Sequence, residues 1–234
     1  MSSWIPAAPR SPVVPPGAPT LARDPPEHGR NFWIRDGALA DPNAVRARLL
    51  AHERWNLGYP HRAESWPGMR APDALDADEL AGIEAWVRSV TGCARLWVGT
   101  APGGARLDCN VAQLVGARES GARPHTDRRD LCRYAAVVYL NPRPPAGAGT
   151  SFYRLRYANG ALGGNACPAP HDNLVQALRV ARLPPGAWAE EARVENAFNR
   201  ILLYKASLVH SATRYFGESA DEKRLTVAFF WMGE

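Results

Sequence analysis

The sequence has almost no lysine. Only two of its 28 Lys and Arg residues are lysines, Lys205 and Lys223, and the arginines are scattered among acidic residues. The net charge of +5 and the pI of about 9.3 therefore do not come from a basic block or a basic helix face of the kind that follows nucleic-acid phosphates. We expect no nucleic-acid partner.

Long apolar runs are also missing. No stretch approaches the roughly 20 apolar residues that a membrane-spanning helix needs. The N-terminal stretch is rich in proline and lacks the apolar centre of a secretion signal. From these two absences we expect no membrane partner and a cytoplasmic location.

Cysteine is sparse, and no two cysteines are spaced as C-x-x-C. The four are Cys93, Cys109, Cys132 and Cys167. This spacing argues against a zinc ribbon and against a thioredoxin-like redox site. Without a secretion signal, the thiols are expected to be reduced and partly buried.

What the sequence does contain is enough for one domain with a sizeable core. It has 234 residues, of which 46% are hydrophobic. Residues 1–29 hold eight prolines and few apolar side chains, which predicts a disordered tail. Residues 30–234 are expected to form a single domain.

Two helices are expected in the first part of this domain. The first spans about 41–55, with Asp41 as N-cap and Pro42 at the first helical position. The second spans 76–91, where apolar residues recur at helical spacing between an aspartate cap and a terminal glycine. The Pro- and Gly-containing stretch 56–74 between them predicts a loop.

Short strand-like segments dominate the rest of the chain, separated by Gly, Pro and Asn. We expect strands at 31–35, 95–99, 109–115, 134–140, 150–155, 200–205 and 225–231. Residues 157–192 interrupt this rhythm with a polar stretch and a helix around 172–182, which we interpret as an insertion or a lid.

Two helices followed by a run of strands favour an α+β fold. We expect the centre of the domain to be a β-sandwich or a jelly-roll barrel.

The most informative motif is a His-x-Asp pair, His125 and Asp127, followed 85 residues later by His210. In an extended segment residues i and i+2 point to the same side, so the pair can reach one metal ion. Two imidazoles and a carboxylate on one face of a metal form the facial triad of non-heme Fe(II) oxygenases. Taken singly, each residue also suits a plainer role, as a surface polar group or a histidine at the core edge.

An arginine completes the constellation. Arg224 lies 14 residues beyond His210 at the start of an apolar strand, where a rigid element can project it. A guanidinium can grip a carboxylate with two hydrogen bonds. Arg214 is the alternative anchor, nearer to His210 but ahead of a polar loop. The four residues together indicate an iron site whose co-substrate carries a carboxylate.

These motifs resemble the iron(II)- and 2-oxoglutarate-dependent dioxygenase superfamily, and within it the prolyl-hydroxylase-like branch. The resemblance covers about residues 108–233 and rests on an ordered set of segments: 109–115, 124–127, 134–141, 149–153, 199–204, 209–211 and 224–231. It implies a double-stranded β-helix, the jelly-roll or cupin-like architecture, over residues 108–233, with residues 30–107 as helical support. The Pro-Gly-x-Arg element at 67–70 is similar to one in a bacterial subgroup without a well-defined activity.

The resemblance implies Fe(II), 2-oxoglutarate and O₂, with release of succinate and CO₂. It implies iron ligands at His125, Asp127 and His210, and a 2-oxoglutarate site at Arg224, Thr226 and Tyr139, with Tyr134 as the alternative to Tyr139. Related halogenases carry a small residue in place of the carboxylate ligand. Because Asp127 is present, hydroxylation, desaturation or ring closure is favoured over halogenation.

The substrate is the least determined part. The candidates for a wall that holds a polar substrate are Arg70, Trp66, Arg154 and Arg156. The plainer interpretation is that the arginines are exposed to solvent and that the tryptophan only packs in the core. The leading hypothesis is a hydroxylase of a small molecule such as an amino acid or a natural-product intermediate. The chain could also assemble as a homodimer, which we keep as an open expectation.

Two alternatives to a small-molecule hydroxylase stay open. One is hydroxylation of a protein or peptide side chain. The other is a non-catalytic jelly-roll protein that binds a metal or ligand, which predicts loss of at least one triad or anchor residue. All four of those residues are present.

Overall fold

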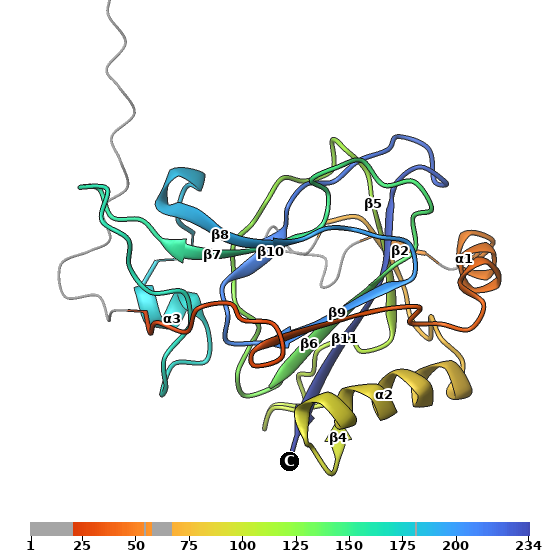
Figure 1. The fold of residues 1–234 in the computed structure, drawn as a ribbon, viewed down its shortest axis with the longest axis horizontal. Helices are drawn as coiled ribbons and strands as arrows, with labels where there is room; N and C mark the ends of the chain where they lie inside the picture. The colour runs from red at the N-terminus through yellow and green to blue at the C-terminus, as the bar shows by residue number, and fades with distance from the viewer. Residues whose placement is uncertain (1–20, 54, 58–66, 181) are drawn as a thin grey trace, which may run out of the picture.

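The structure is a computed structural model that describes residues 21–53, 55–57, 67–180 and 182–234 (Figure 1). Its α-helices are α1 (Pro42–Leu50), α2 (Ala77–Thr91) and α3 (Leu174–Leu178). Its strands are β1 (Phe32–Asp36), β2 (Asn56–Leu57), β3 (Met69–Ala71), β4 (Leu96–Trp97), β5 (Val111–Val115), β6 (Tyr134–Tyr139), β7 (Thr150–Leu155), β8 (Trp188–Val194), β9 (Arg200–Lys205), β10 (His210–Ala212) and β11 (Arg224–Gly233).

Two antiparallel sheets make the core. The larger sheet has the strand order β1-β9-β6-β11-β5-β3-β2, and β4 pairs with one end of β11. The smaller sheet has the order β10-β7-β8. Apolar side chains from both sheets, among them Phe152 on β7 and Leu202 on β9, pack in one buried cluster. The predicted double-stranded β-helix is confirmed.

The strands of the larger sheet alternate between two environments, as side chains of a pleated strand must. On β9, Ile201 and Leu203 join a cluster on the outer face of the sheet, together with residues of α1 and α2. Leu202 and Tyr204 point to the inner face, toward the smaller sheet. The inner face therefore carries the residues that line the interior of the barrel.

Helix α2 covers the outer face of the larger sheet (Figure 1). A reciprocal capping box between Asp76 and Glu79 begins it, and Gly92 ends it in the left-handed conformation (φ 73°). Ile83 and Val87 are fully buried against the sheet. The helix predicted at 76–91 is confirmed.

Several expected boundaries were wrong. Helix α1 stops at Leu50 rather than near Trp55, which packs on the same cluster without helical backbone. The expected loop 56–74 contains β2 and β3, and its residues 58–66 lie outside the described part of the chain. Strands of two or three residues are too short to show a periodicity, and only their pairing defines them: β2 pairs with β3, and β3 pairs with β5.

The expected insertion at 157–192 is shorter than predicted. Its last residues, from Trp188 on, belong to β8, which pairs along the whole of β7. The helix expected at 172–182 spans only Leu174–Leu178, because Arg179 adopts a left-handed backbone (φ 56°) that ends it. The segment between the two strands is thus a long excursion from the smaller sheet.

Part of the expected N-terminal tail is packed. Within 21–29, Leu21 is buried, Ala22 forms a β-bridge with Ala166, and the Asp24 amide donates to Asn165 Oδ1 at 2.7 Å. The ordered chain therefore includes residue 21, and residues 1–20 lie outside the description. The support region 30–107 is also less helical than expected, since it contributes β1 to β4 to the larger sheet.

The thiols are as expected. All four cysteines are free, and three are buried while Cys109 is half-buried. Burial raises the pKa of the Cys109 thiol to about 11, which suppresses its reactivity. No helix within the described ranges is long and apolar enough to span a membrane.

Candidate metal centre

The two histidines of the motif lie side by side because their backbones pair. His125 and His210 form an antiparallel bridge, in which each amide donates to the carbonyl of the other at 3.0 and 2.9 Å. The segment that carries His125 thus continues the smaller sheet next to β10. Two residues on, the Asp127 amide donates to the Ala206 carbonyl, which keeps the segment extended. The His-x-Asp pair therefore presents both side chains to His210.

The three side chains converge on one point. His125 Nε2 lies 3.8 Å from Asp127 Oδ1, and His210 Nε2 lies 3.7 Å from Asp127 Oδ2. One ligand atom from each residue lies within 4.8 Å of the other two. The imidazole ring centroids are 4.4 Å apart. This is a His₂-carboxylate donor set, the combination that a facial triad uses.

Backbone carbonyls fix which imidazole nitrogen faces the centre. Nδ1 of His125 lies 2.8 Å from the Arg123 carbonyl, and Nδ1 of His210 lies 2.9 Å from the Leu208 carbonyl. A carbonyl only accepts, so Nδ1 carries the proton and Nε2 keeps its lone pair. Both Nε2 lone pairs are then available to a metal ion, an orientation typical of metal-ligating histidines.

Without a cation, burial works against charge at this site. Burial and the neighbouring His210 lower the pKa of His125 to about 4, and burial lowers the pKa of His210 to about 4. Burial raises the pKa of Asp127 to about 6, although His125 opposes the shift. Oδ2 of Asp127 is buried and has no hydrogen-bond partner. A divalent cation would give this buried carboxylate oxygen the partner that it lacks, so the three residues fit a metal ion.

Arg224 is a buried guanidinium that lacks an anion. Its exposed fraction is 3%, and its Nε is buried with no hydrogen-bond partner. Its other contacts are a long hydrogen bond to Thr226 at 3.5 Å and the rings of Tyr139 and Tyr215, 5.5 and 5.8 Å away. No ion pair joins it to an acidic residue of the described chain. A buried charge without a partner is costly, so the arrangement fits a carboxylate ligand.

Burial distinguishes the paired candidates that the sequence left open. Arg214 is exposed, and its guanidinium donates to the Ala146 carbonyl at 2.7 Å, whereas Arg224 is buried. Tyr134 packs in the outer cluster near Trp33, whereas Tyr139 is fully buried on the inner face. The Tyr139 hydroxyl lies 2.7 Å from Thr150 Oγ1.

One row of cross-strand neighbours joins Thr226 and Tyr139 to Arg70, a candidate substrate residue. The row crosses β3, β5, β11 and β6 and consists of Arg70, Gln113, Thr226 and Tyr139. Directly opposite residues point to the same face of a sheet, so Arg70 shares the inner face with Thr226. Burial lowers the pKa of Arg70, and the Asp108 carboxylate 3.7 Å away opposes the shift.

The Pro-Gly-x-Arg element has a steric explanation. Gly68 has φ +79°, and a Cβ there would lie 2.3 Å from the Leu114 carbonyl oxygen. Only glycine permits this backbone to approach β5 so closely and in this conformation. The close approach lets β3 pair with β5, which sets Arg70 opposite Gln113.

The remaining substrate candidates lie elsewhere or outside the description. Arg154 donates to the carbonyls of Gly163 and Leu162 at 3.0 and 3.3 Å, so it holds the excursion after β7 rather than the centre. Arg156 is exposed and forms an isolated bridge with Leu162. Trp66 lies outside the described residues.

Sequence reasoning missed Tyr204. Its ring lies 4.4 Å from the ring of His210, and it is buried beneath the triad. Burial, with the nearby Asp127 carboxylate, raises its pKa well above the usual value, so the phenol stays protonated. The sequence did contain a signal for this position, because the alternation of side chains along strand 200–205 places residue 204 on the same face as residue 202.

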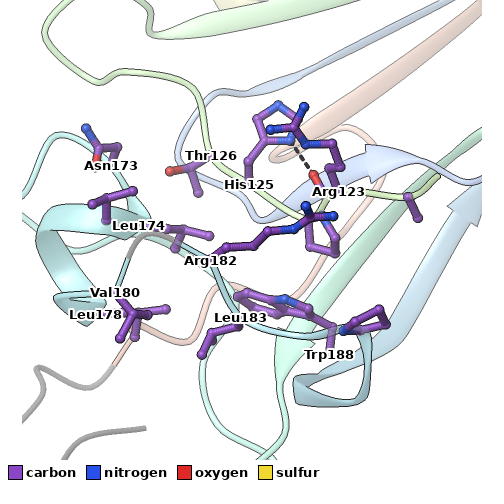
Figure 2. Close-up of a pocket in the computed structure, with 14 residues that line it drawn as sticks. Arg123, His125, Thr126, Asn173, Leu174, Leu178, Val180, Arg182, Leu183 and Trp188 are labelled. Carbon is purple, nitrogen blue, oxygen red and sulfur yellow. Dashed lines mark hydrogen bonds between the residues drawn. The ribbon is translucent and has the colours of Figure 1, made fainter. Parts of the chain in front are cut away.

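A cavity of about 190 Å³ opens beside His125. Figure 2 shows it between the strand segment that carries Arg123 and His125 and the excursion that carries α3. The two other triad residues are more buried, with side-chain exposures of 7% and 5% against 26% for His125. The centre is therefore accessible from the side of His125.

Residues 19–231 match the profile of a protein family described as a family of unknown function, DUF6445. The chain belongs to this family. No curated protein matches the DUF6445 sequence.

Solved structures show which fold the DUF6445 chain has. It is similar to the non-heme alpha-ketoglutarate-dependent epimerase SnoN from nogalamycin biosynthesis, with a TM-score of 0.53 and 20% identity over 87% of this chain and 78% of that one. The carbocyclase SnoK from the same biosynthesis gives a TM-score of 0.52 at 11% identity, over 87% and 79% of the two chains.

A third similar structure is a prolyl hydroxylase from Trichoplax adhaerens, in complex with a peptide fragment of hypoxia inducible factor. Its TM-score is 0.50 at 13% identity, over 87% of this chain and 84% of that one. At these identities the similarities establish the fold. The DUF6445 chain has the double-stranded β-helix of the iron- and 2-oxoglutarate-dependent enzymes, and the resemblance seen in the sequence is confirmed at that level.

Proposed function

We propose that this DUF6445 protein is an Fe(II)- and 2-oxoglutarate-dependent oxygenase that hydroxylates a small molecule and releases succinate and CO₂. One observation carries the proposal. The buried polar atoms without a hydrogen-bond partner in the described residues include Oδ2 of Asp127 at the triad and Nε of Arg224 in the same barrel. A divalent cation satisfies the first and a carboxylate satisfies the second, and 2-oxoglutarate is a ligand that joins the two.

Each residue then has a defined task. His125, Asp127 and His210 hold the iron through two Nε2 atoms and a carboxylate, with both imidazoles oriented by backbone carbonyls. The bound iron with 2-oxoglutarate supplies oxidative decarboxylation coupled to O₂ activation. Tyr204 packs against the ring of His210 and keeps water from that side of the centre.

The co-substrate site is built on β11 and β6. Arg224 grips the distal carboxylate of 2-oxoglutarate, and burial makes that ion pair stronger than one in water. The hydroxyls of Thr226 and Tyr139 lie on adjacent strands in direct register and offer further hydrogen bonds. Tyr139 is held in place by Thr150.

We propose hydroxylation as the reaction, although enzymes with this fold catalyse several kinds of reaction. The similar structures include an epimerase and a carbocyclase by their titles. The carboxylate of Asp127 occupies the position that a halide ligand needs, which argues against halogenation. Hydroxylation requires only the centre and a substrate C–H bond held beside it.

The cavity supports a small molecule over a peptide. It is walled on one side by α3 and the residues that follow, and its volume of about 190 Å³ falls below the roughly 300–1,000 Å³ of sites for drug-sized ligands. An apolar cavity of about 150 Å³ holds benzene, so this one suits a molecule the size of an amino acid.

Anaerobic binding tests the proposal without depending on the substrate. Equilibrium dialysis against Fe(II) and labelled 2-oxoglutarate should give one of each per chain. His125→Ala should lose the iron, since it removes one of three ligands. A wild-type chain that retains neither iron nor 2-oxoglutarate would overturn the proposal. Binding without turnover under any condition would favour the non-catalytic jelly-roll alternative.

A further inference from the structure

The cavity beside His125 has one apolar wall, supplied by the excursion between β7 and β8. Leu174 and Leu178 come from α3, Leu183 comes from the segment that leads into β8, and Trp188 is the first residue of β8. All but Leu183 are buried, and the four pack in or against the same cluster. The wall is thus continuous with the protein core and presents an apolar surface to whatever occupies the cavity.

The excursion is anchored, so the cavity is preformed. The Arg129 amide donates to the Asp172 carbonyl at 2.9 Å, and the Cys167 amide donates to the Ser207 carbonyl at 2.9 Å. Asn173 caps α3 by accepting from the Gln176 amide at 3.0 Å. These bonds tie the apolar wall to the strand segment that carries the triad.

The opposite side of the cavity is positively charged. Arg123 and Arg182 line it, and no acidic residue is among the described residues that do so. Figure 2 shows the Arg182 side chain extended across the cavity on the side of Arg123 and His125, with Leu183 and Trp188 beyond it. Arg182 forms no hydrogen bond or ion pair with any residue that the structure describes. Its five donors are available to a ligand.

The geometry points to a substrate with a carboxylate and a compact apolar body. This inference rests on the proposed function and names the class of molecule that the centre oxidises. The carboxylate pairs with Arg182, with Arg123 adding to the positive field. The apolar body packs on Leu183 and Trp188. Because His125 lines the same cavity, a molecule held in this way has its remaining face toward the metal centre.

The experiment compares an acid with its neutral amide. The probes are 3-phenylpropionate and 3-phenylpropanamide, which differ in charge and hardly in size. Binding is measured by calorimetry or ligand-observed NMR on the full chain, with Zn(II) replacing Fe(II) and 2-oxoglutarate present. We expect the acid to bind about tenfold more tightly than the amide, as a charge-assisted hydrogen bond requires.

Variants assign the selectivity to the cavity. Arg182→Gln should weaken the acid about tenfold and leave the amide unchanged. Arg179→Gln is the matched control, because Arg179 is exposed on the same segment but does not line the cavity. It should change neither affinity. Leu183→Ala should weaken acid and amide alike, because both share the apolar body.

Three results would overturn the inference: no binding of the acid, equal binding of acid and amide, or equal losses in the two arginine variants. The measurement is repeated on metal-free protein without 2-oxoglutarate, since the cavity residues need neither. If the metal-free chain binds the acid selectively but the protein does not bind iron, the proposed function is wrong and the inferred acid site stands. If the protein binds iron and 2-oxoglutarate but does not prefer the acid, the inferred acid site is wrong and the proposed function stands.

Discussion

His125 and His210 exchange both of their backbone hydrogen bonds, at 3.0 and 2.9 Å, although 85 residues separate them in the chain. This bridge sets the two imidazoles next to each other before any metal is present. The only freedom left is side-chain rotation, which the carbonyls of Arg123 and Leu208 restrict further. The centre is therefore preorganised by backbone pairing, and the predictions below depend on that rigidity.

Asp127→Asn should stabilise the metal-free protein at neutral and alkaline pH. The folded pKa of Asp127 is raised to about 6 from 3.8, so the folded chain retains a proton that the unfolded chain loses between those values. The burial of the carboxylate therefore costs stability increasingly as pH rises through that window, and fully above it. The shift corresponds to roughly 1–3 kcal/mol, which the asparagine recovers.

Chemical denaturation of metal-free wild type and variant at pH 8 and pH 4 checks this. The gain should be present at pH 8 and nearly absent at pH 4, because pH 4 is close to the unfolded pKa of 3.8 and the folded carboxyl is protonated there. Addition of Zn(II) should stabilise the wild type far more than the variant. A variant less stable than wild type at pH 8 without metal would show that Asp127 has a protein partner.

The histidines produce the opposite dependence at lower pH. Their folded pKa values of about 4 lie below the ordinary 6.5, so the unfolded chain binds more protons in that interval. Stability of the metal-free protein should fall as pH drops from 6.5 toward 4, and His210→Gln should flatten this slope. Thermal unfolding across that range, without metal, measures it. A slope unchanged in the variant would place the acid sensitivity elsewhere.

Arg224→Gln should raise the KM for 2-oxoglutarate about 100-fold, because loss of a buried ion pair to a ligand costs several kcal/mol. Arg214→Gln is the matched control and should leave the KM unchanged, since Arg214 is exposed and bonded to Ala146. Succinate formation against 2-oxoglutarate concentration provides both values. The opposite ranking of the two variants would make Arg214 the anchor.

Tyr139→Phe should weaken 2-oxoglutarate binding and destabilise the fold by about 1 kcal/mol, because Thr150 loses its hydroxyl partner. Tyr134→Phe should leave 2-oxoglutarate binding unchanged, since Tyr134 packs in the outer cluster. Dialysis with labelled 2-oxoglutarate and denaturant titration measure the two effects. Equal losses of binding in both variants would contradict the assignment of faces.

Gly68→Ala should destabilise the protein by more than about 1 kcal/mol, because a Cβ at φ +79° meets the Leu114 carbonyl oxygen. Gly82→Ala is the control. Gly82 lies within α2 with open space around it, so alanine should stabilise by roughly 0.5–1 kcal/mol. Urea denaturation of the two variants compares them directly. A tolerated Gly68→Ala would mean that β3 does not need its close approach to β5.

Much of the centre was predictable because its signals are local. The i, i+2 spacing of His125 and Asp127 needs only an extended backbone, and Arg224 opens a strand that is apolar in sequence. Alternation along 134–139 also separates Tyr139 from Tyr134. The larger sheet and α2 followed from the same kind of short-range pattern.

What escaped prediction depends on long-range packing. Strands β2, β3 and β10 have too few residues for a period to emerge, so only their partners define them. Arg182 follows a short helix whose end is set by the left-handed Arg179, and nothing in the sequence directs it toward His125. Arg154 was predicted to line the substrate site, but its guanidinium donates a hydrogen bond to the Gly163 carbonyl in the excursion after β7.

The central claim is tested most directly by oxygen-dependent conversion of 2-oxoglutarate to succinate. Purified chain is loaded with Fe(II) and 2-oxoglutarate under anaerobic conditions, O₂ is admitted, and succinate is measured beside a His125→Ala control. The account predicts succinate from the wild type, increased by a carboxylate substrate that fits the cavity, and none above background from the variant. Succinate formation that is equal in the two proteins, or absent from the wild type with every such acid, would contradict it.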